Sequence, residues 1–438
     1  MSIVAYAGID WHEASLRVYA VSEDSGEMVI DSTVLNDKAS VTKVFKKWGK
    51  SYTLRCCYES GAGGYVLYRW LRDLGIECMV VAASLVPQRG GDQIKTDRRD
   101  AINLARNLRK GDLTPVHIPT EDEERARRLV RHRTMLVESI VKTKNQIQKL
   151  LLSAGIKKPF PSSWTSQHET WLEGLKLPGV DGEIFASHLA MLKFQRSQMK
   201  SMEDQLEIIA ASDTYRDRVS RLMCLKGIRL VSAMVLITEI IDFNRFKSPR
   251  QLMAYLGLVP TESSSGKRRR QGSITKAGNR RCRHILVESS WSYRNKPKIS
   301  DDLKKRQKGQ SDEVIAHSWK AQKRLYKKYW GITNRSKATG VAAVAVAREL
   351  VGFLWGLMTG NFARVDNEDS AEVTAKPAAG QAKKLETALE VEKALKLIQE
   401  SDPRLIERLQ SKLVDASRYA SGLPATGCSP TAGLGAGG

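Results

Sequence analysis

The chain has 438 residues and carries 71 Lys and Arg against 48 Asp and Glu, a formal net charge of +23. This length exceeds that of one ordinary core, so two or three domains are expected. The charge indicates a polyanionic partner, most often nucleic acid. The six cysteines form no C-x-x-C pair, which argues against a zinc finger or a disulfide framework.

Neither a membrane span nor a signal peptide is expected. The longest apolar run, 341–358, is interrupted by Arg348 and Glu349. Near the N-terminus, Asp10 breaks any apolar signal region. We therefore expect a cytoplasmic protein with no membrane partner.

The first hundred residues alternate between predicted strands and helices. Strands are expected over 3–9, 15–21, 28–35, 52–58 and 78–83, and helices over 38–50 and 64–74. An antiparallel meander that continues into βαβ units predicts a mixed sheet flanked by helices. Asp10 and Glu59 each follow a predicted strand, at the edge where open parallel sheets bind ligands.

Two more carboxylates, Asp97 and Asp100, lie three residues apart at the start of an amphipathic run. On a helix they share one face of the first turn. One interpretation makes them ligands of a divalent metal that meets a phosphate. The other makes Asp97 the helix N-cap and Asp100 a residue that compensates the helix dipole. Spacing alone leaves both interpretations open.

Four carboxylates at one sheet edge could hold two divalent ions about 4 Å apart, the arrangement used in phosphoryl transfer. The set is Asp10, Glu59, Asp97 and Asp100. His12 lies two residues beyond Asp10, and the sequence assigns it no role because such histidines are often simply packed.

Two long amphipathic helices are predicted next, over 121–155 and 183–209. Their apolar spacing of threes and fours is typical of a coiled coil. The segment 157–178 between them, which contains Pro, Ser and Trp, is expected to be irregular. The pair is either a structural hairpin or a dimerisation arm.

A second chemical candidate lies in the last third of the chain, where Ser263, Ser264, Ser265 and Gly266 precede four cationic residues. A serine beside cations could attack a phosphodiester and form a covalent intermediate. Alternatively, 261–279 is a flexible Ser/Gly loop whose cations only hold a nucleic-acid backbone. Helices are expected on either side, ending with 342–358. The tail beyond about 361 has ten Lys and Arg against eleven Asp and Glu, and is expected to be partly helical and then disordered.

Several short motifs, in order, resemble those of one protein family. They are Gly8-Ile9-Asp10-Trp11-His12, Tyr58-Glu59-Ser60-Gly61, Lys95-Thr96-Asp97-Arg98-Arg99-Asp100-Ala101, Leu225-Lys226-Gly227-Ile228, Tyr255-Leu256-Gly257-Leu258-Val259-Pro260, Ser264-Ser265-Gly266 and Gly272-Ser273-Ile274-Thr275-Lys276-Ala277-Gly278-Asn279. The family is that of the DEDD insertion-sequence transposases, the insertion-sequence one-ten family, related to the Piv-type DNA invertases.

The resemblance implies three folded regions and a tail. An α/β RNase H-like (RuvC-like) domain with a mixed sheet would occupy 1–120, and a coiled-coil region 121–215. A mainly α C-terminal transposase domain with a catalytic serine would occupy 216–360. The remaining residues, 361–438, exceed the usual length of the family.

The resemblance also implies the site. The tetrad Asp10, Glu59, Asp97 and Asp100 would bind Mg²⁺ or Mn²⁺, and Ser265 would join covalently to DNA, with Ser264 as the alternative. Nucleic-acid contacts are expected from Arg98, Arg99, Lys267, Arg268, Arg269, Arg270 and Lys276.

The implied partners are donor DNA, target DNA and a structured noncoding bridge RNA that pairs with both. A homodimer or homotetramer is expected, with the tetrad from one protomer and the serine from another, in a prokaryotic cytoplasm and associated with the nucleoid. Two alternatives stay open. One is a RuvC-type metal-dependent junction nuclease without serine chemistry, and the other is a non-enzymatic basic nucleic-acid-binding protein.

Overall fold

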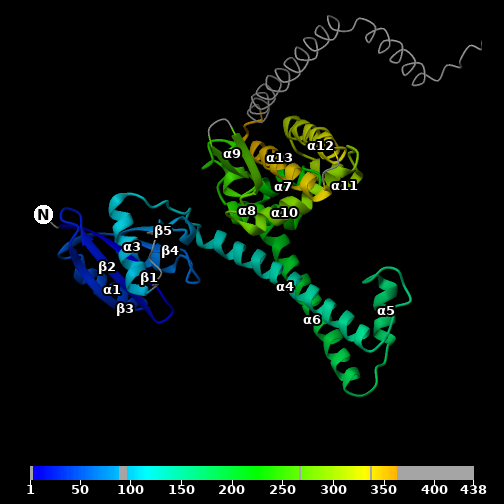
Figure 1. Cartoon of the computed structure of the whole chain (residues 1–438), viewed down its shortest axis with the longest axis horizontal. Coiled ribbons are helices and arrows are strands. Elements are labelled where there is room, and N and C mark those ends of the chain that lie inside the picture. The colour runs from blue at the N-terminus through cyan, green and yellow to red at the C-terminus, as the bar shows by residue number, and fades with distance from the viewer. Residues whose placement is uncertain (1–2, 88–95, 266–267, 336–337, 363–438) are drawn as a thin grey trace, which may run out of the picture. The chain divides into compact units, whose positions relative to one another are not determined.

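The computed structural model describes residues 3–87, 96–265, 268–335 and 338–362 (Figure 1). It divides into two compact units, Met1–Leu129 and Val130–Gly438. The predicted tail lies outside the described residues from 363 onward.

The first unit is a five-stranded mixed sheet with helices on both faces. Its elements are β1 (Ile3–Trp11), β2 (Ser15–Ser22), β3 (Met28–Leu35), α1 (Lys38–Trp48), β4 (Tyr52–Glu59), α2 (Val66–Asp73), β5 (Glu77–Val81), a 3₁₀ turn η1 (Ala83–Leu85) and α3 (Asp97–Lys110). The strand order is β3-β2-β1-β4-β5. The first three strands pair antiparallel, and β4 and β5 continue in parallel from β1. The predicted mixed sheet is confirmed.

The two faces of this sheet are read directly from the alternation of residues along its central strand. Ala5, Ala7 and Ile9 join the larger core cluster, which contains the buried side chains of α1 and α2. The residues between them face α3: Tyr6 packs in a cluster with Ala101 and other buried residues. Because side chains alternate between faces along a strand, Asp10 belongs to the α3 face.

Helix α3 lies directly on β1 because Gly8 has no side chain. A Cβ added at Gly8 would lie 2.2 Å from the Ala101 carbonyl oxygen and 2.5 Å from the Ala105 amide nitrogen. These are backbone atoms, which cannot move aside as a flexible side chain would. Gly8 therefore sets the distance between the helix that begins with Asp97 and the strand that ends beside Asp10.

We expect Gly8→Ala to loosen this contact and to destabilise the first unit by about 3 kcal/mol, the upper range for overpacking a tight core. Hydrogen–deuterium exchange of the β1 and α3 amides measures the effect. The control is Gly331→Ala, where an added Cβ meets nothing within 4 Å and the residue lies in a helix. That change is expected to be neutral or stabilising by about 0.5–1 kcal/mol. Unchanged protection in Gly8→Ala would contradict this account of the packing.

A long antiparallel helix pair forms the arm of the second unit. It consists of α4 (Glu121–Ser153, which begins in the first unit) and α6 (Gly179–Ala211). Arg133 of α4 binds Glu203 at 2.7 Å, and Thr143, further along α4, donates to Gln195 at 3.1 Å. A later residue of α4 therefore contacts an earlier residue of α6, so the second helix packs back on the first, as predicted.

The segment between the two long helices is not wholly irregular. It contains α5 (Ser166–Gly174), whose Leu172 is buried with residues of α4 and α6. The expectation of an irregular connection over 157–178 is therefore wrong for these nine residues. Thr165 caps α5 by accepting a hydrogen bond from the His168 amide, a start signal that the Pro and Trp residues around it obscured.

The rest of the second unit is a helical bundle with one β-hairpin. Its elements are α7 (Arg216–Met223), α8 (Leu230–Ile240), α9 (Pro249–Tyr255), β6 (Pro260–Ser265), β7 (Arg268–Ile274), α10 (Arg280–Ser290), a 3₁₀ turn η2 (Trp291–Arg294), α11 (Asp301–Gln307), α12 (Asp312–Thr333) and α13 (Thr339–Thr359). Of the described helices, α13 alone is long and apolar enough to cross a membrane. Two-thirds of its most apolar window is buried (67%), so it serves as the core helix of the bundle.

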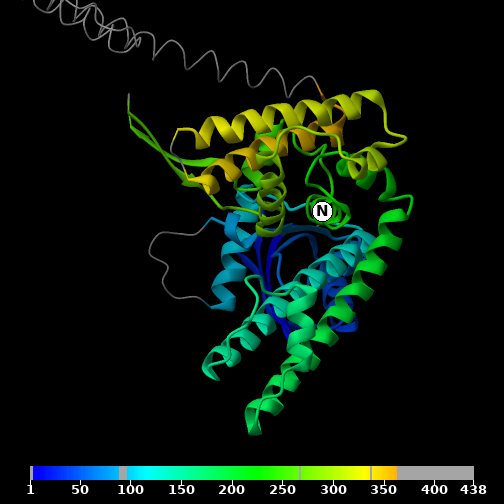
Figure 2. The same cartoon turned by 90° about the vertical axis from the view of Figure 1, so that its right-hand side faces the viewer.

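A β-hairpin occupies the stretch for which a flexible loop was one of the two interpretations. Strands β6 and β7 pair antiparallel, with Ser263 opposite Arg270 and Ser265 opposite Arg268. The interpretation of 261–279 as a flexible loop is therefore wrong for both strands. Figure 2 shows the hairpin extending away from the helices of its unit. Backbone pairing between β6 and β7 orders this segment, although its content of Ser, Gly and Arg suggested a flexible loop.

A buried carboxylate joins the arm to the bundle. The Glu239 side chain of α8 is only 1% exposed and accepts two hydrogen bonds from the Arg131 guanidinium of α4, at 2.8 and 2.9 Å. Asn279 donates to the same carboxylate at 2.8 Å, and its own oxygen caps α10. A buried charge is stable only when it is paired in this way. Asn279, the last residue of the motif at 272–279, is thus tied to the arm through Glu239.

Candidate functional site

Two of the predicted acidic residues end adjacent parallel strands. Asp10 is the penultimate residue of β1, and Glu59 is the last residue of β4. The register pairs Ile9 with Tyr58, which places Asp10 and Glu59 on neighbouring strands at the same edge. Cys57, two residues before Glu59, donates from its Sγ to the Leu104 carbonyl of α3, so Glu59 also belongs to the α3 face.

The other two acidic residues lie in the first turn of α3. Asp97 is the first residue of α3, and Asp100 is the fourth. The residue that caps the helix is Thr96, whose hydroxyl accepts from the Arg99 amide at 3.3 Å. The alternative in which Asp97 is the N-cap is therefore wrong. Both carboxylates still lie in the first turn, at the positive end of the helix dipole.

His12 brings the strand and the helix together. Its Nε2 lies 3.0 Å from an oxygen of Asp10 and 3.4 Å from an oxygen of Asp97. The hydrogen bond and charge of Asp10, and then the charge of Asp97, raise the pKa of His12. The imidazole is half exposed, while Asp10 is mostly covered (22% exposed). No role for His12 was predicted from the sequence, where its position two residues beyond a strand-end aspartate was the available signal.

The ligand atoms of Asp10, His12 and Asp97 all lie within 4.8 Å of one another. Glu59 and Asp100 are outside that group of three in the part of the chain that the structure describes. The structure thus brings two of the four predicted ligands into contact range, adds a histidine, and keeps the other two on the adjoining strand end and helix turn.

The chemistry of this donor set fits a divalent cation. Carboxylate oxygens are the ligands that Mg²⁺ and Mn²⁺ prefer. Because two carboxylates leave several positions of an octahedral ion to water or phosphate, the pair resembles a substrate-assisted divalent-metal site more than a closed cage. Asp97 is 66% exposed, so the site is accessible from solvent.

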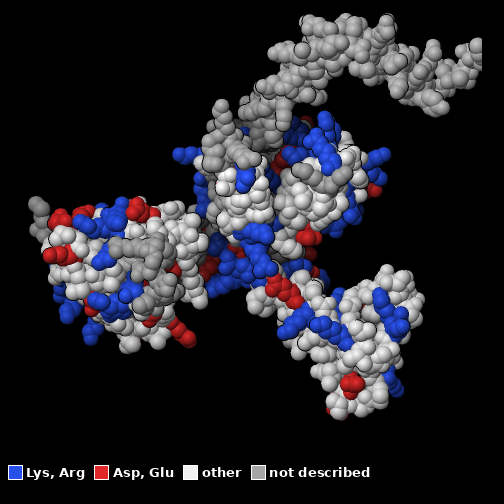
Figure 3. Space-filling view, viewed as in Figure 1, with Lys and Arg blue, Asp and Glu red and all other residues white. Residues whose placement is uncertain are grey.

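Arg98 of the same segment contacts an acidic residue of β3. Arg98 binds Asp31 through Nε at 2.9 Å and through a terminal nitrogen at 2.7 Å. Arg17 pairs with the same carboxylate, which therefore neutralises part of both cations. Arg98 remains more than half exposed, and both Arg98 and Arg99 lie one turn or less from Asp97. On the visible surface of the second unit, Lys and Arg cover more area than Asp and Glu do (Figure 3).

The remaining predicted cations belong to the hairpin region. The backbones of Arg268, Arg269 and Arg270 form β7, and Arg270 is exposed. Lys267 lies outside the described residues. Ser265 ends β6 and is therefore held at the far end of the hairpin by backbone pairing with Arg268.

The base of the hairpin is held by close backbone contacts. Lys276 is exposed and adopts a left-handed backbone (φ 56°), and its amide donates to the Gly257 carbonyl at 3.1 Å. A Cβ at Gly257 would lie 2.1 Å from the Ala277 oxygen, and one at Gly278 would lie 1.9 Å from the Tyr255 oxygen. Two glycines of the recognised motifs thus permit the contact that anchors the hairpin.

Comparison with known proteins defines the class. A family model described as "Transposase", the DEDD type, matches residues 7–156, and a second, "Transposase IS116/IS110/IS902 family", matches residues 219–304. The first match contains the four acidic residues Asp10, Glu59, Asp97 and Asp100. The second contains the β6–β7 hairpin with Ser265. The protein is therefore a DNA transposase, an enzyme that acts on DNA.

Individual relatives agree with the models. The chain is 39% identical over 360 residues to "Putative transposase y4qE" of Sinorhizobium fredii, covering 81% of this chain and 88% of the relative. It is 29% identical to the transposase for insertion sequence element IS1533 of Leptospira borgpetersenii, covering 76% of this chain and 97% of that protein. The chain belongs to the IS116/IS110/IS902 family of insertion-sequence transposases, as the resemblance of its motifs implied.

Proposed function

We propose that this transposase cleaves and exchanges DNA strands with a divalent metal held by its acidic edge and with Ser265 as the nucleophile. The first unit is proposed to be of the RNase H-like class, on the support of its mixed sheet and of acidic residues at the ends of β1 and β4. The observation that carries the proposal is the convergence of Asp10, His12 and Asp97 from a strand end and a helix start.

The metal ligands proposed are Asp10 and Asp97, completed by Glu59 and Asp100. Bound Mg²⁺ would neutralise the phosphate and stabilise the leaving oxygen. His12 donates from Nε2 to Asp10 and lies 3.4 Å from Asp97, so it holds the two carboxylates in place, as outer partners of metal ligands do. The exposure of Asp97 leaves room for a DNA phosphate.

The serine step is a direct displacement at phosphorus. The Ser265 oxygen attacks a DNA phosphate, its proton is released, and the bond to one deoxyribose oxygen breaks, which leaves a serine–DNA phosphodiester. A free hydroxyl of the partner strand then attacks the same phosphorus and regenerates the serine. The neighbouring arginines of β7 balance the phosphate charge. We propose that the tetrad and the serine come from two protomers of a dimer or tetramer, with arm helices α4 and α6 forming the contact.

Sequence choice is proposed to come from a structured noncoding RNA that pairs with donor and target DNA. The support is the positive charge and the family membership. The test is to purify the protein from cells that contain its element, to sequence the bound RNA, and to assay strand exchange with and without ribonuclease treatment.

One discrete RNA species and activity that ribonuclease removes are the expected results. Exchange that proceeds with no RNA would replace RNA guidance by direct protein recognition of the DNA ends. Cleavage without rejoining and without a protein–DNA adduct would favour the metal-dependent junction nuclease instead.

A further inference from the structure

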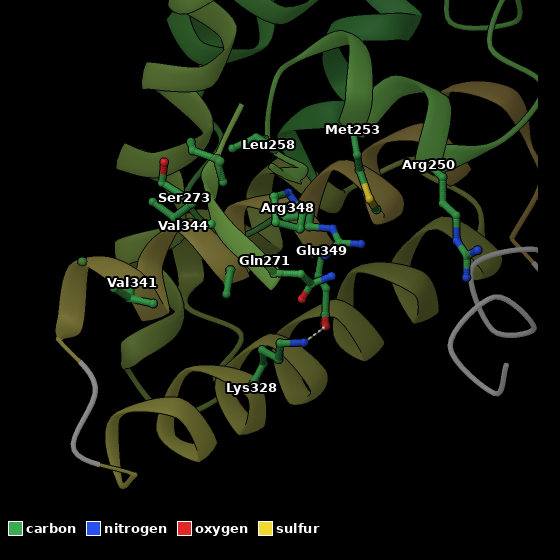
Figure 4. Close-up of a pocket in the computed structure, with 15 residues that line it drawn as sticks. Arg250, Met253, Leu258, Gln271, Ser273, Lys328, Val341, Val344, Arg348 and Glu349 are labelled. Atoms are coloured by element: carbon green, nitrogen blue, oxygen red, sulfur yellow. Dashed lines mark hydrogen bonds and ion pairs between the residues drawn. The ribbon is translucent and has the colours of Figure 1, made fainter. Parts of the chain in front are cut away.

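A pocket of about 570 Å³ opens at the base of the β6–β7 hairpin in the second unit (Figure 4). Apolar side chains of α13 line it, and Glu349 in its wall is paired with Lys328 at 2.5 Å. These contacts select no particular ligand. By contrast, the ion pairs beside the acidic edge of the first unit have a defined geometry with respect to Asp10.

Asp31, in the middle of β3, binds two arginines from different elements. Arg98 comes from the first turn of α3 and donates from Nε at 2.9 Å, with a terminal nitrogen at 2.7 Å. Arg17 comes from β2, and it also donates to Thr33 at 3.1 Å. The side chains of Asp31 and Arg17 are only 18% and 22% exposed. Water and salt therefore screen this pair less than they screen a surface ion pair.

The strand register places Arg17 beside a proposed metal ligand. Arg17 is the direct partner of Asp10 across β1 and β2. It is also the direct partner of Thr33 across β2 and β3, and Asp31 lies two residues before Thr33. Tyr19, which pairs with Asp31, packs in the cluster that contains residues of α3. Because side chains alternate along a strand, Asp10, Arg17 and Asp31 all belong to the face that α3 covers.

Arg17 therefore lies between two carboxylates, one on each neighbouring strand. Directly opposite residues on adjacent strands have Cβ atoms about 4.5–5.5 Å apart, and diagonal neighbours are about 7–8 Å apart, both within reach of a long side chain. The guanidinium of Arg17 binds the diagonal carboxylate, Asp31, although Asp10 is directly opposite. Asp10 itself is bound to His12 at 3.0 Å.

We propose that Asp31 is a positioning residue, which binds Arg17 and so leaves the Asp10 carboxylate available to the divalent ion. The inference rests on the proposed function, since it needs a metal at the acidic edge. A guanidinium and a metal ion compete for the same carboxylate oxygens, and arginine–carboxylate pairs are among the stronger hydrogen-bonded pairs. Without Asp31, Asp10 becomes the alternative partner of Arg17. Arg98 supports the arrangement, because it holds the Asp31 carboxylate from the side of α3.

The test measures the Mn²⁺ affinity of the full chain by titration calorimetry in the absence of DNA. Asp31→Asn keeps the shape of the side chain but removes its charge, so that Arg17 turns to Asp10. The affinity should then fall by about tenfold or more, the scale on which the loss of an outer partner of a metal ligand acts. A second substitution in the same chain, Arg17→Gln, should restore most of the lost affinity.

Restoration by the second substitution separates positioning from a purely structural role. If Asp31 only stabilised the sheet, replacing Arg17 as well would remove the contact with Thr33 and would not restore Mn²⁺ binding. Arg17→Gln alone should bind Mn²⁺ at least as tightly as the wild type, because it removes a positive charge near the ligands of a cation. This single variant tests the inference even where Asp31→Asn fails to fold, which thermal unfolding of each metal-free variant detects.

The matched control is another ion pair of the same sheet. Glu77 pairs with Arg55 at 3.1 Å, and the two residues are direct partners across β4 and β5. Glu77→Gln makes the same kind of change as Asp31→Asn, and it is expected to leave the Mn²⁺ affinity at the wild-type level. An equal loss of affinity in Glu77→Gln would show that removal of any carboxylate from the sheet is sufficient, which would overturn the specific role of Asp31.

The remaining outcomes distinguish this inference from the proposed function. Wild-type affinity in a folded Asp31→Asn, or a loss that Arg17→Gln does not restore, would overturn the role of Asp31 and leave the metal site standing. Weaker binding in Arg17→Gln alone would do the same, because the arginine would then support the site. No Mn²⁺ binding by the wild-type chain would remove the metal site and the inference together.

Discussion

Substitution of Ser265 by alanine is expected to abolish the covalent protein–DNA adduct and to lower strand exchange by at least about a thousandfold, the scale on which loss of a nucleophile acts. The reason is that no other group replaces the serine oxygen in the displacement at phosphorus. DNA binding should persist, since the cations of β7 are unchanged. The measurement is denaturing electrophoresis of labelled DNA after reaction with Mg²⁺ and the bound RNA.

The two neighbouring serines provide the matched controls. Ser263→Ala and Ser264→Ala make the same change within the same strand, where these residues pair with Arg270 and Arg269. Each is expected to keep the adduct. An adduct that persists in Ser265→Ala but disappears in Ser264→Ala would move the nucleophile by one residue. Full activity in all three variants would remove serine chemistry from the mechanism.

The second large effect, a loss of metal binding and of DNA cleavage, is expected on substitution of Asp10 or Asp97. Asp10→Asn and Asp97→Asn preserve the shape of each side chain but remove one negative charge from the metal ligand. We expect each to weaken Mn²⁺ binding by at least about a hundredfold, more than the loss of an outer partner of a metal ligand, and to stop DNA cleavage. Titration calorimetry with Mn²⁺ and a cleavage assay measure the two effects separately.

A carboxylate elsewhere in the same unit is the control for charge alone. Asp112 is exposed and follows α3 at its other end, so Asp112→Asn should leave metal affinity and cleavage unchanged. Wild-type metal affinity in both Asp10→Asn and Asp97→Asn would refute the metal site. The two carboxylates would then be interpreted as partners of His12 only.

Much of the first unit could be predicted from its sequence because its signals are local. Alternating and continuous apolar runs gave the five strands to within a few residues, and the βαβ pattern gave the mixed sheet. Asp10 and Glu59 could be placed at strand ends for the same reason, since each directly follows an apolar run. The family motifs then connected the acidic residues with a serine far along the chain, and the comparisons confirmed the family.

The errors lie where composition and structure disagree. The stretch rich in Ser, Gly and Arg forms β6 and β7 although such residues have low strand propensity, because its two halves pair with one another and close backbone contacts hold its base. Helix α5 was missed because its cap and buried Leu172 are set among Pro, Ser and Trp residues. Thr96 rather than Asp97 caps α3, a difference of one residue that local propensity does not resolve.

The order of the motifs and the types of their side chains are properties of the sequence, and they were sufficient to predict an insertion-sequence transposase, which the comparisons confirmed. The distances between those side chains are not. Asp97 meets His12 and Asp10 only because α3 lies on β1 at Gly8, and these segments are more than eighty residues apart in the chain. Contacts of this kind depend on which faces pack together, and for that reason the position of His12 between Asp10 and Asp97 emerged only from the folded chain.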